Sequence, residues 1–223
     1  MTGTSYFSRP DLPETMFIRY ALQFGNRHIV HSLINQLELQ NTVDFSSDDA
    51  LCLDLGSGSG ISILPLASRL GIKNFFAIDG AQPMLDYVET EFAPLLPGVT
   101  VNTILADLES ETINLPDGIS LLTNSTATLS YISNISHVLS EACRLTMPSG
   151  FFSCNVSLHL NDTCESIYCL NPNNADTYAH SKKLMYELLS DHGFSLVTAG
   201  VYANHPSEKM SGTFEHTLIF RKK

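Results

Sequence analysis

Apolar runs alternate with amphipathic segments along the middle of this chain. Four short runs, residues 51–55, 74–79, 99–105 and 119–125, have the length and composition of buried strands, and a fifth follows Gly150. The segments between most of them have the length of helices. Strands that alternate with helices predict a mostly parallel sheet with helices on both faces, an α/β fold.

The two ends of the chain continue this pattern. Apolar side chains recur at helical spacing before the first strand, so residues 13–40 are predicted to be helical. After the fifth strand we expect an irregular polar segment, then a helix, then two strands, over residues 158–174, 175–191, 194–202 and 213–220. The whole chain has 223 residues, of which 43% are hydrophobic, and it contains no repeat or proline-rich linker. We therefore expect one domain, residues 1–223, with one large core.

Charge and cysteine content narrow the class of protein. The formal net charge is −11, and basic residues cluster only in two short groups, which argues against nucleic acid as a partner. We expect no membrane partner, because no apolar stretch has the length of a membrane span. Five cysteines without a C-x-x-C pair or a signal-peptide core favour a cytoplasmic protein without a metal site. The sequence specifies no oligomeric state.

A glycine-rich turn follows the first predicted strand. Gly56, Gly58 and Gly60 alternate there with serines, and Ile61 begins what reads as a helix. Glycines at such a turn let the backbone approach a ligand closely, and a helix start offers free N–H groups. The spacing is neither the G-x-G-x-x-G of dinucleotide-binding proteins nor a phosphate loop ending in Gly-Lys-Ser/Thr. The turn therefore predicts binding of a different nucleotide ligand.

The acidic residue before this turn and the later strand ends identify a family. The stretch Asp54-x-Gly56-x-Gly58-x-Gly60 resembles motif I of the class I methyltransferases that use S-adenosylmethionine (SAM). The resemblance continues in order and spacing over roughly residues 50–157. Its further landmarks are Asp79 with Gly80 to Leu85, Ala106-Asp107-Leu108, residues 119–125, and residues 139–150, where Ser149 replaces a usual glycine.

The resemblance implies a doubly wound, seven-stranded sheet of order 3-2-1-4-5-7-6 with the last strand antiparallel. It also implies three regions: a helical lid over residues 1–45, a cofactor-binding core over 46–157, and a substrate-side segment with a helix and terminal hairpin over 158–223. SAM is the implied cofactor. In the family, the glycine turn holds its methionine end, the second acid binds the ribose and the third lies beside the adenine. The residues that would bind it are Asp54, Gly56, Ser57, Gly58, Asp79, Gly80, Met84, Asp107, Leu108 and Asn124.

The acceptor side carries weaker signals. At the end of the fourth strand, Asn124-Ser125-Thr126-Ala127 lacks the Asn/Asp-Pro-Pro-aromatic clamp of the methyltransferases that act on amino groups of nucleic acid or protein. This favours a small-molecule acceptor. His159 is the best candidate for a general base, because it follows the fifth strand and an ordinary imidazole titrates near neutral pH. His137 and His180 fall on predicted helices and read as solvated. Candidate substrate contacts are Tyr6, Tyr20, Tyr131 and Tyr178, together with Arg9 and Tyr168.

Three functions fit these residues. The first is transfer of the SAM methyl group to a small molecule by in-line displacement, where alignment matters more than covalent help. The second is a non-methyl use of SAM by the same fold, by cyclisation or aminocarboxypropyl transfer with release of methylthioadenosine. The third is a non-catalytic SAM-binding or partner-binding module. The three acids beside the glycines argue against the third.

Overall fold

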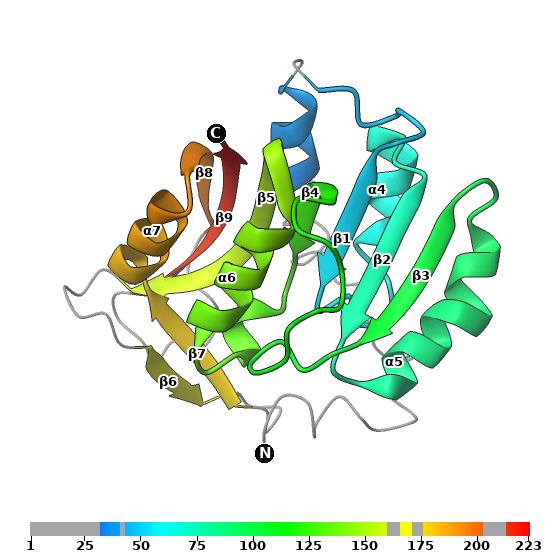
Figure 1. Cartoon of the computed structure of the whole chain (residues 1–223). Helices are drawn as coiled ribbons and strands as arrows, with labels where there is room; N and C mark the ends of the chain where they lie inside the picture. Colours follow the sequence, from blue (N-terminus) through cyan, green and yellow to red (C-terminus); the bar gives the residue numbers. More distant parts are fainter. Residues whose placement is uncertain (1–31, 41–42, 160–165, 171–175, 203–212) are drawn as a thin grey trace.

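The computed structural model describes residues 32–40, 43–159, 166–170, 176–202 and 213–223. These residues form one nine-stranded sheet with helices packed on it (Figure 1). A first helix covers residues 32–38. The elements that follow are β1 (Leu51–Leu55), α4 (Ile63–Leu70), β2 (Asn74–Asp79), α5 (Gln82–Tyr87), η1 (Val88–Phe92), η2 (Ala93–Leu95), β3 (Thr100–Leu105), β4 (Ser120–Ser125), η3 (Leu129–Tyr131), α6 (Ile135–Leu145), β5 (Thr146–His159), β6 (Ile167–Leu170), β7 (Asp176–Ser181), α7 (Lys182–Asp191), β8 (Phe194–Tyr202) and β9 (Thr213–Lys222).

The main part of the sheet has the predicted order. Strands β3, β2, β1, β4 and β5 are neighbours in that sequence and run parallel. The other edge of β5 pairs with β9, which runs antiparallel, and β9 pairs with β8. Counting only these seven strands gives 3-2-1-4-5-7-6 with the last strand antiparallel, so the prediction is confirmed. The strands β6 and β7 add an extension beyond it, at the lower edge of Figure 1.

The sheet buries an apolar cluster on each face. On one face α6 and α7 pack with side chains such as Val138 and Met185 against Leu53 of β1. On the other face the 32–38 helix, α4 and α5 cover Cys52 of the same strand. Alternate residues of β1 thus enter different clusters, as the period of a strand requires when both faces are covered. Among the described helices, none has the length and apolar character needed to cross a membrane.

The region after β5 differs from the prediction. The prediction of a helix over residues 175–191 is wrong for residues 176–181. These residues form β7, and α7 begins at Lys182. The Ser181 hydroxyl accepts a hydrogen bond from the Leu184 amide and so caps α7. His180, expected on a solvated helix face, is instead buried in β7. The irregular segment predicted over 158–174 is also wrong where β5 ends and where β6 forms.

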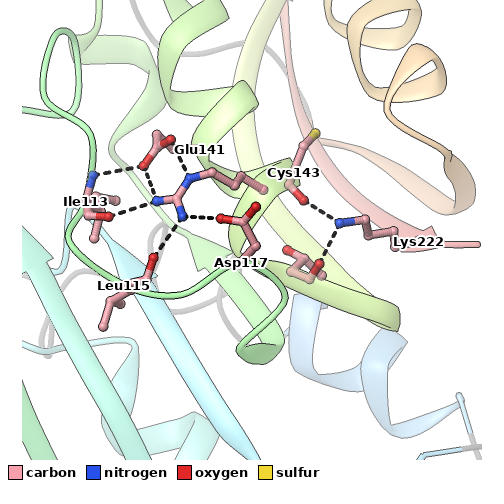
Figure 2. A network of polar contacts seen from close by, with 8 residues as sticks. Ile113, Leu115, Asp117, Glu141, Cys143 and Lys222 are labelled. Atoms are coloured by element: carbon pink, nitrogen blue, oxygen red, sulfur yellow. Dashed lines mark hydrogen bonds and ion pairs between the residues drawn. The ribbon is translucent and has the colours of Figure 1, made fainter.

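The connection between β3 and β4 contains no helix, and Arg144 of α6 fastens it to the fold (Figure 2). The guanidinium donates to the backbone oxygens of Ile113 and Leu115, both at 2.8 Å. Its other partners are the carboxylates of Glu141 and Asp117, both at 2.7 Å. Glu141 in turn accepts a hydrogen bond from the Ile113 amide. The side chains of one helix thus satisfy backbone groups that a crossover helix would pair internally.

A second cationic side chain, Lys222, caps the C-terminal end of α6. The Lys222 ammonium of β9 donates to the backbone oxygens of Cys143 and Thr146, both at 2.7 Å (Figure 2). The last carbonyls of a helix have no partner within it, and a positive charge there also complements the helix dipole. Lys222 therefore ties the last strand of the chain to the helix that precedes β5.

We expect Arg144→Met to lower the free energy of unfolding by about 2–3 kcal/mol. The substitution keeps most of the packing but leaves two carbonyls and the mostly buried Glu141 carboxylate without their charged partner. Urea denaturation measures the change. As a control, Lys73→Met breaks an exposed ion pair with Asp48 and should cost less than about 1 kcal/mol. Equal losses in the two variants would contradict the anchoring role of Arg144.

Candidate functional site

The carboxyl ends of four of the parallel strands, β1 to β4, bring the predicted cofactor residues to one edge of the sheet. Asp54 of β1 is in register with Asn124 of β4. Asp79 ends β2 beside Leu105 of β3, and its backbone oxygen accepts a hydrogen bond from Ala106. Ligands of open α/β sheets bind at this edge. Predicted cofactor residues that are far apart in the sequence therefore lie close together at this edge.

The glycine turn is bent over the end of β2. Gly56, Gly58 and Gly60 all have φ values between 52° and 83°, which favour glycine. The amides of Gly56 and Ser57 both donate to the backbone oxygen of Ile78, at 2.7 and 3.1 Å. This bond pair fixes the turn on the neighbouring strand. The α4 helix begins three residues after Gly60, slightly later than expected.

The three glycines have different reasons to lack a side chain. A Cβ on Gly56 would lie 2.1 Å from the Thr128 side chain, and one on Gly60 would lie 2.7 Å from the Phe92 ring. Among the described residues, nothing lies within 4 Å of a Cβ on Gly58. The protein's own packing therefore requires the outer two glycines, whereas the middle one borders open space. That space is where the backbone can approach a ligand.

Asp79 closes one side of this space. Its two carboxylate oxygens accept hydrogen bonds from the amides of Gly58 and Ala81, at 2.8 and 2.9 Å. Burial raises the pKa of Asp79, while these backbone hydrogen bonds lower it. Each oxygen keeps lone pairs for a further donor, so the carboxylate can accept hydrogen bonds from a pair of hydroxyl groups.

Asp54 lies beneath the turn in a buried polar network. It is fully buried, and its carboxylate accepts hydrogen bonds from the Ser62 hydroxyl at 2.6 Å and the Asn124 amide at 2.7 Å. The Asn124 oxygen accepts one from Ser153 at 2.9 Å. Burial raises the pKa of Asp54 to about 6, with a smaller contribution from the charge of Asp79. The network joins β1, the start of α4, β4 and β5. Asp54 and Asn124 therefore fix the strand ends and the helix start between which the glycine turn lies.

The remaining predicted cofactor residues lie around the same edge. The Asp107 carboxylate accepts hydrogen bonds from the Glu109 amide and the Ser110 hydroxyl, which shapes the turn after β3. Leu108 and Met84 are buried, and Gly80 follows Asp79 directly. These positions can form the floor and wall of a site for a flat ring system.

The residues present fit a nucleoside-like cofactor. The Ser57 hydroxyl is buried and has no hydrogen-bond partner within the part of the chain that the structure describes. An unpaired buried hydroxyl is costly, so a ligand at the turn would supply what this oxygen lacks. The open space at Gly58 and the lone pairs of Asp79 adjoin it.

The segment after β4 contributes residues that the sequence did not indicate. Ala127 has φ of 58°, unusual for a residue with a side chain, and its amide donates to the Asn155 side chain at 2.5 Å. The next residue, Thr128, donates to the Gly56 backbone oxygen at 2.9 Å. A hydrogen bond between residues 72 positions apart leaves no periodic trace in the sequence. Thr128 and Asn155 could not have been found by pattern.

The structure describes only some of the residues that are predicted to contact the acceptor. Tyr131 is in η3 and Tyr178 in β7, on segments joined by the hydrogen bond between His180 and Leu129. His159 ends β5 between β7 and β9, and it is only 1% exposed. The predicted lid residues Tyr6, Arg9 and Tyr20 lie outside the described residues.

Comparison with known proteins adds a family to this geometry. Residues 53–154 match the model of a family described as "Methyltransferase domain". No curated protein matches the chain in sequence. Many solved structures share its fold.

Three of these structures show the extent of the likeness. One is a Galdieria sulphuraria protein provisionally described as a sarcosine dimethylglycine methyltransferase, with TM-score 0.66, 14% identity and coverage of 87% of this chain and 85% of that one. Another is a SAM-dependent methyltransferase of Methanosarcina mazei, with TM-score 0.62, 19% identity and coverage of 83% and 96%. The third is geranyl diphosphate C-methyltransferase of Streptomyces coelicolor, with TM-score 0.63, 11% identity and coverage of 85% and 78%.

Asp54→Asn is expected to change how stability depends on pH. The pKa of Asp54 is raised to about 6, above the value of about 3.9 for an unfolded aspartate. Between these values the folded protein binds a proton that the unfolded chain has released, so the contribution of Asp54 to stability falls as the pH rises through this window. Asparagine has no such titration and nearly the same size.

Urea denaturation at several pH values between 4 and 7 tests this. The free energy of unfolding of the variant, relative to the parent protein, should increase with pH by up to about 3 kcal/mol. A difference that stays constant across this range would mean that Asp54 titrates at its ordinary pKa.

Proposed function

We propose that this chain, whose residues 53–154 belong to the class I superfamily of SAM-dependent methyltransferases, transfers the SAM methyl group to a small-molecule acceptor. The observation that carries the proposal is the space at Gly58, bordered by the Asp79 carboxylate and by the Ser57 hydroxyl, which has no hydrogen-bond partner within the described residues. SAM supplies a methyl carbon that is made electrophilic by the adjacent sulfonium. The protein then has to bind, orient and align the reactants, which can contribute roughly 7–11 kcal/mol.

The described residues suggest how the cofactor is held. We assign the ribose hydroxyls to Asp79, whose two oxygens are fixed by backbone amides but keep free lone pairs. The backbone from Gly56 to Gly58 would hold the methionine end. Asp107 and Leu108 lie beyond Asp79 along the same edge and would take the adenine. Asp54 acts indirectly, because it has no exposed surface and supports the turn through Ser62.

Several observations favour a small acceptor. The formal net charge of −11 disfavours polyanionic substrates, and the strand end at Asn124 lacks the proline clamp of the enzymes that modify amino groups in macromolecules. Two of the similar solved structures carry names of small-molecule methyltransferases. We keep Tyr131 and Tyr178 as proposed acceptor contacts and His159 as the proposed base. A cytoplasmic location agrees with Cys52, Cys143 and Cys154, which are free and buried.

Incubation of the purified protein with SAM and pooled small metabolites tests the activity directly. We expect S-adenosylhomocysteine to form only when an acceptor is present, together with one metabolite that has gained a methyl group. Mass spectrometry identifies both products. Formation of methylthioadenosine from SAM alone would contradict methyl transfer and would make the cofactor itself the substrate.

Gly58→Val should abolish SAM binding, measured by isothermal titration calorimetry, because the side chain would fill the space that borders the ligand. We expect affinity to fall at least about 100-fold, equivalent to about 2.8 kcal/mol. Gly98→Val is the matched control. Gly98 also has a positive φ (77°), no described residue lies within 4 Å of its Cβ position, and it lies in a turn before β3. Both variants carry similar backbone strain. Unchanged affinity in Gly58→Val would exclude this turn as the SAM site.

A further inference from the structure

We infer that His180 is a positioning residue for cofactor binding, which couples the β6–β7 extension to the glycine turn through the segment after β4. The inference rests on the proposed binding of SAM at Gly58. His180 lies on β7, next to the last residues of β5, and is fully buried. Neither the family resemblance nor the sequence pattern singles it out as functional.

Both ring nitrogens of His180 are engaged, and each partner defines the role of its nitrogen. Nε2 lies 2.8 Å from the backbone oxygen of Leu129, which can only accept, so Nε2 carries the proton and donates. Nδ1 lies 2.8 Å from the Ser166 hydroxyl, which then donates to it. Burial lowers the pKa of His180 to about 4, so the ring is neutral at pH 7. These partners select one tautomer and one ring orientation.

The electrostatic surroundings are consistent with a neutral ring. The nearby His159 of β5 lowers the pKa of His180 further, and the Glu109 carboxylate, in the connection after β3, raises it slightly. The Tyr178 ring stacks on His180 with centroids 6.5 Å apart. A ring that resists protonation is a poor general base. His180 is suited instead to hold Leu129 in place.

The contact at Leu129 leads directly to the cofactor turn. Leu129 begins η3, and the residue before it, Thr128, donates to the Gly56 backbone oxygen and occupies the space where a Gly56 side chain would be. Asn155 fixes the neighbouring Ala127 in its left-handed conformation. The segment from Ala127 to Leu129 is thus held from three sides: by β5, by the glycine turn and by β7. His180 supplies the hold from β7.

This arrangement links the glycine turn, where the cofactor is proposed to bind, to η3, which carries the proposed acceptor contact Tyr131. If the Leu129 oxygen loses the His180 donor, it keeps the hydrogen bond from the Ile132 amide at 3.2 Å, but that bond is local to η3 and does not tie it to β7. The η3 turn can then shift, and Thr128 no longer packs on Gly56. The glycine turn then loses one of the contacts that shape it before the cofactor arrives, which weakens binding without removing any cofactor contact. By reciprocity, a ligand that tightens the turn also restrains η3, which carries Tyr131.

Isothermal titration calorimetry of the full chain with S-adenosylhomocysteine tests the coupling. His180→Phe removes both hydrogen bonds and should weaken binding by about tenfold, within the range of substitutions that act through a packed network. His180→Gln keeps a side-chain N–H that can reach the Leu129 oxygen and should bind within about twofold of the parent protein. His192→Ala is the control: that histidine caps the end of α7, its ring bonds to the Leu188 oxygen there, and the variant should bind normally.

Hydrogen exchange without ligand separates this inference from the proposed cofactor. We expect amides of residues 56–58 and 126–131 to exchange faster in His180→Phe than in His180→Gln. If the parent protein does not bind S-adenosylhomocysteine, the proposed function fails while the exchange result still decides the role of His180. If His180→Phe does not fold, nitrogen-15 NMR of the parent protein decides, because a proton on Nδ1 at pH 7 would overturn the inference. Equal exchange and equal affinity in both variants would also overturn it.

Discussion

The close contact between Gly56 and Thr128 is the constraint on which the site depends. Because Gly56 has no side chain, the segment after β4 can lie directly on the turn after β1, and the Thr128 hydroxyl bonds to the Gly56 oxygen. In a parallel sheet these two segments leave adjacent strands at the same edge. Contact between them makes one continuous surface from the glycine turn to η3. A larger residue at Gly56 would separate the two.

Buried polar side chains beneath the glycine turn restrict its conformation, and their burial costs free energy of folding. Asp54, Asn124 and Ser153 form a chain of hydrogen bonds across β1, β4 and β5. An ionised carboxylate without exposed surface is unfavourable, and its raised pKa expresses that cost. The apolar clusters on both faces of the sheet offset it. The network in return permits few alternative arrangements, because every member would lose a partner if it moved.

The charged anchors of the fold and the glycine turn occupy opposite edges of the sheet. At the amino edge, Arg144 and Lys222 bind backbone carbonyls of the β3–β4 connection and of the junction between α6 and β5. At the carboxyl edge, the backbone is held in strained or left-handed conformations at Gly58 and Ala127, and the Ser57 hydroxyl has no hydrogen-bond partner among the described residues. Strain and unpaired groups of this kind persist only where the surrounding structure restrains them.

The sequence by itself determined the strand order, the glycine turn and the positions of Asp54, Asp79 and Asp107, because these depend on local hydrophobic pattern and on spacing within a resemblance. It also indicated the cofactor. Only the tertiary structure decided which side chains meet across the sheet. The pairing of Gly56 with Thr128, and of His180 with Leu129, joins residues that are far apart in the chain. The conversion of residues 176–181 from an expected helix to a strand has the same cause, since the end of β5 offered an unpaired edge that local preference does not register.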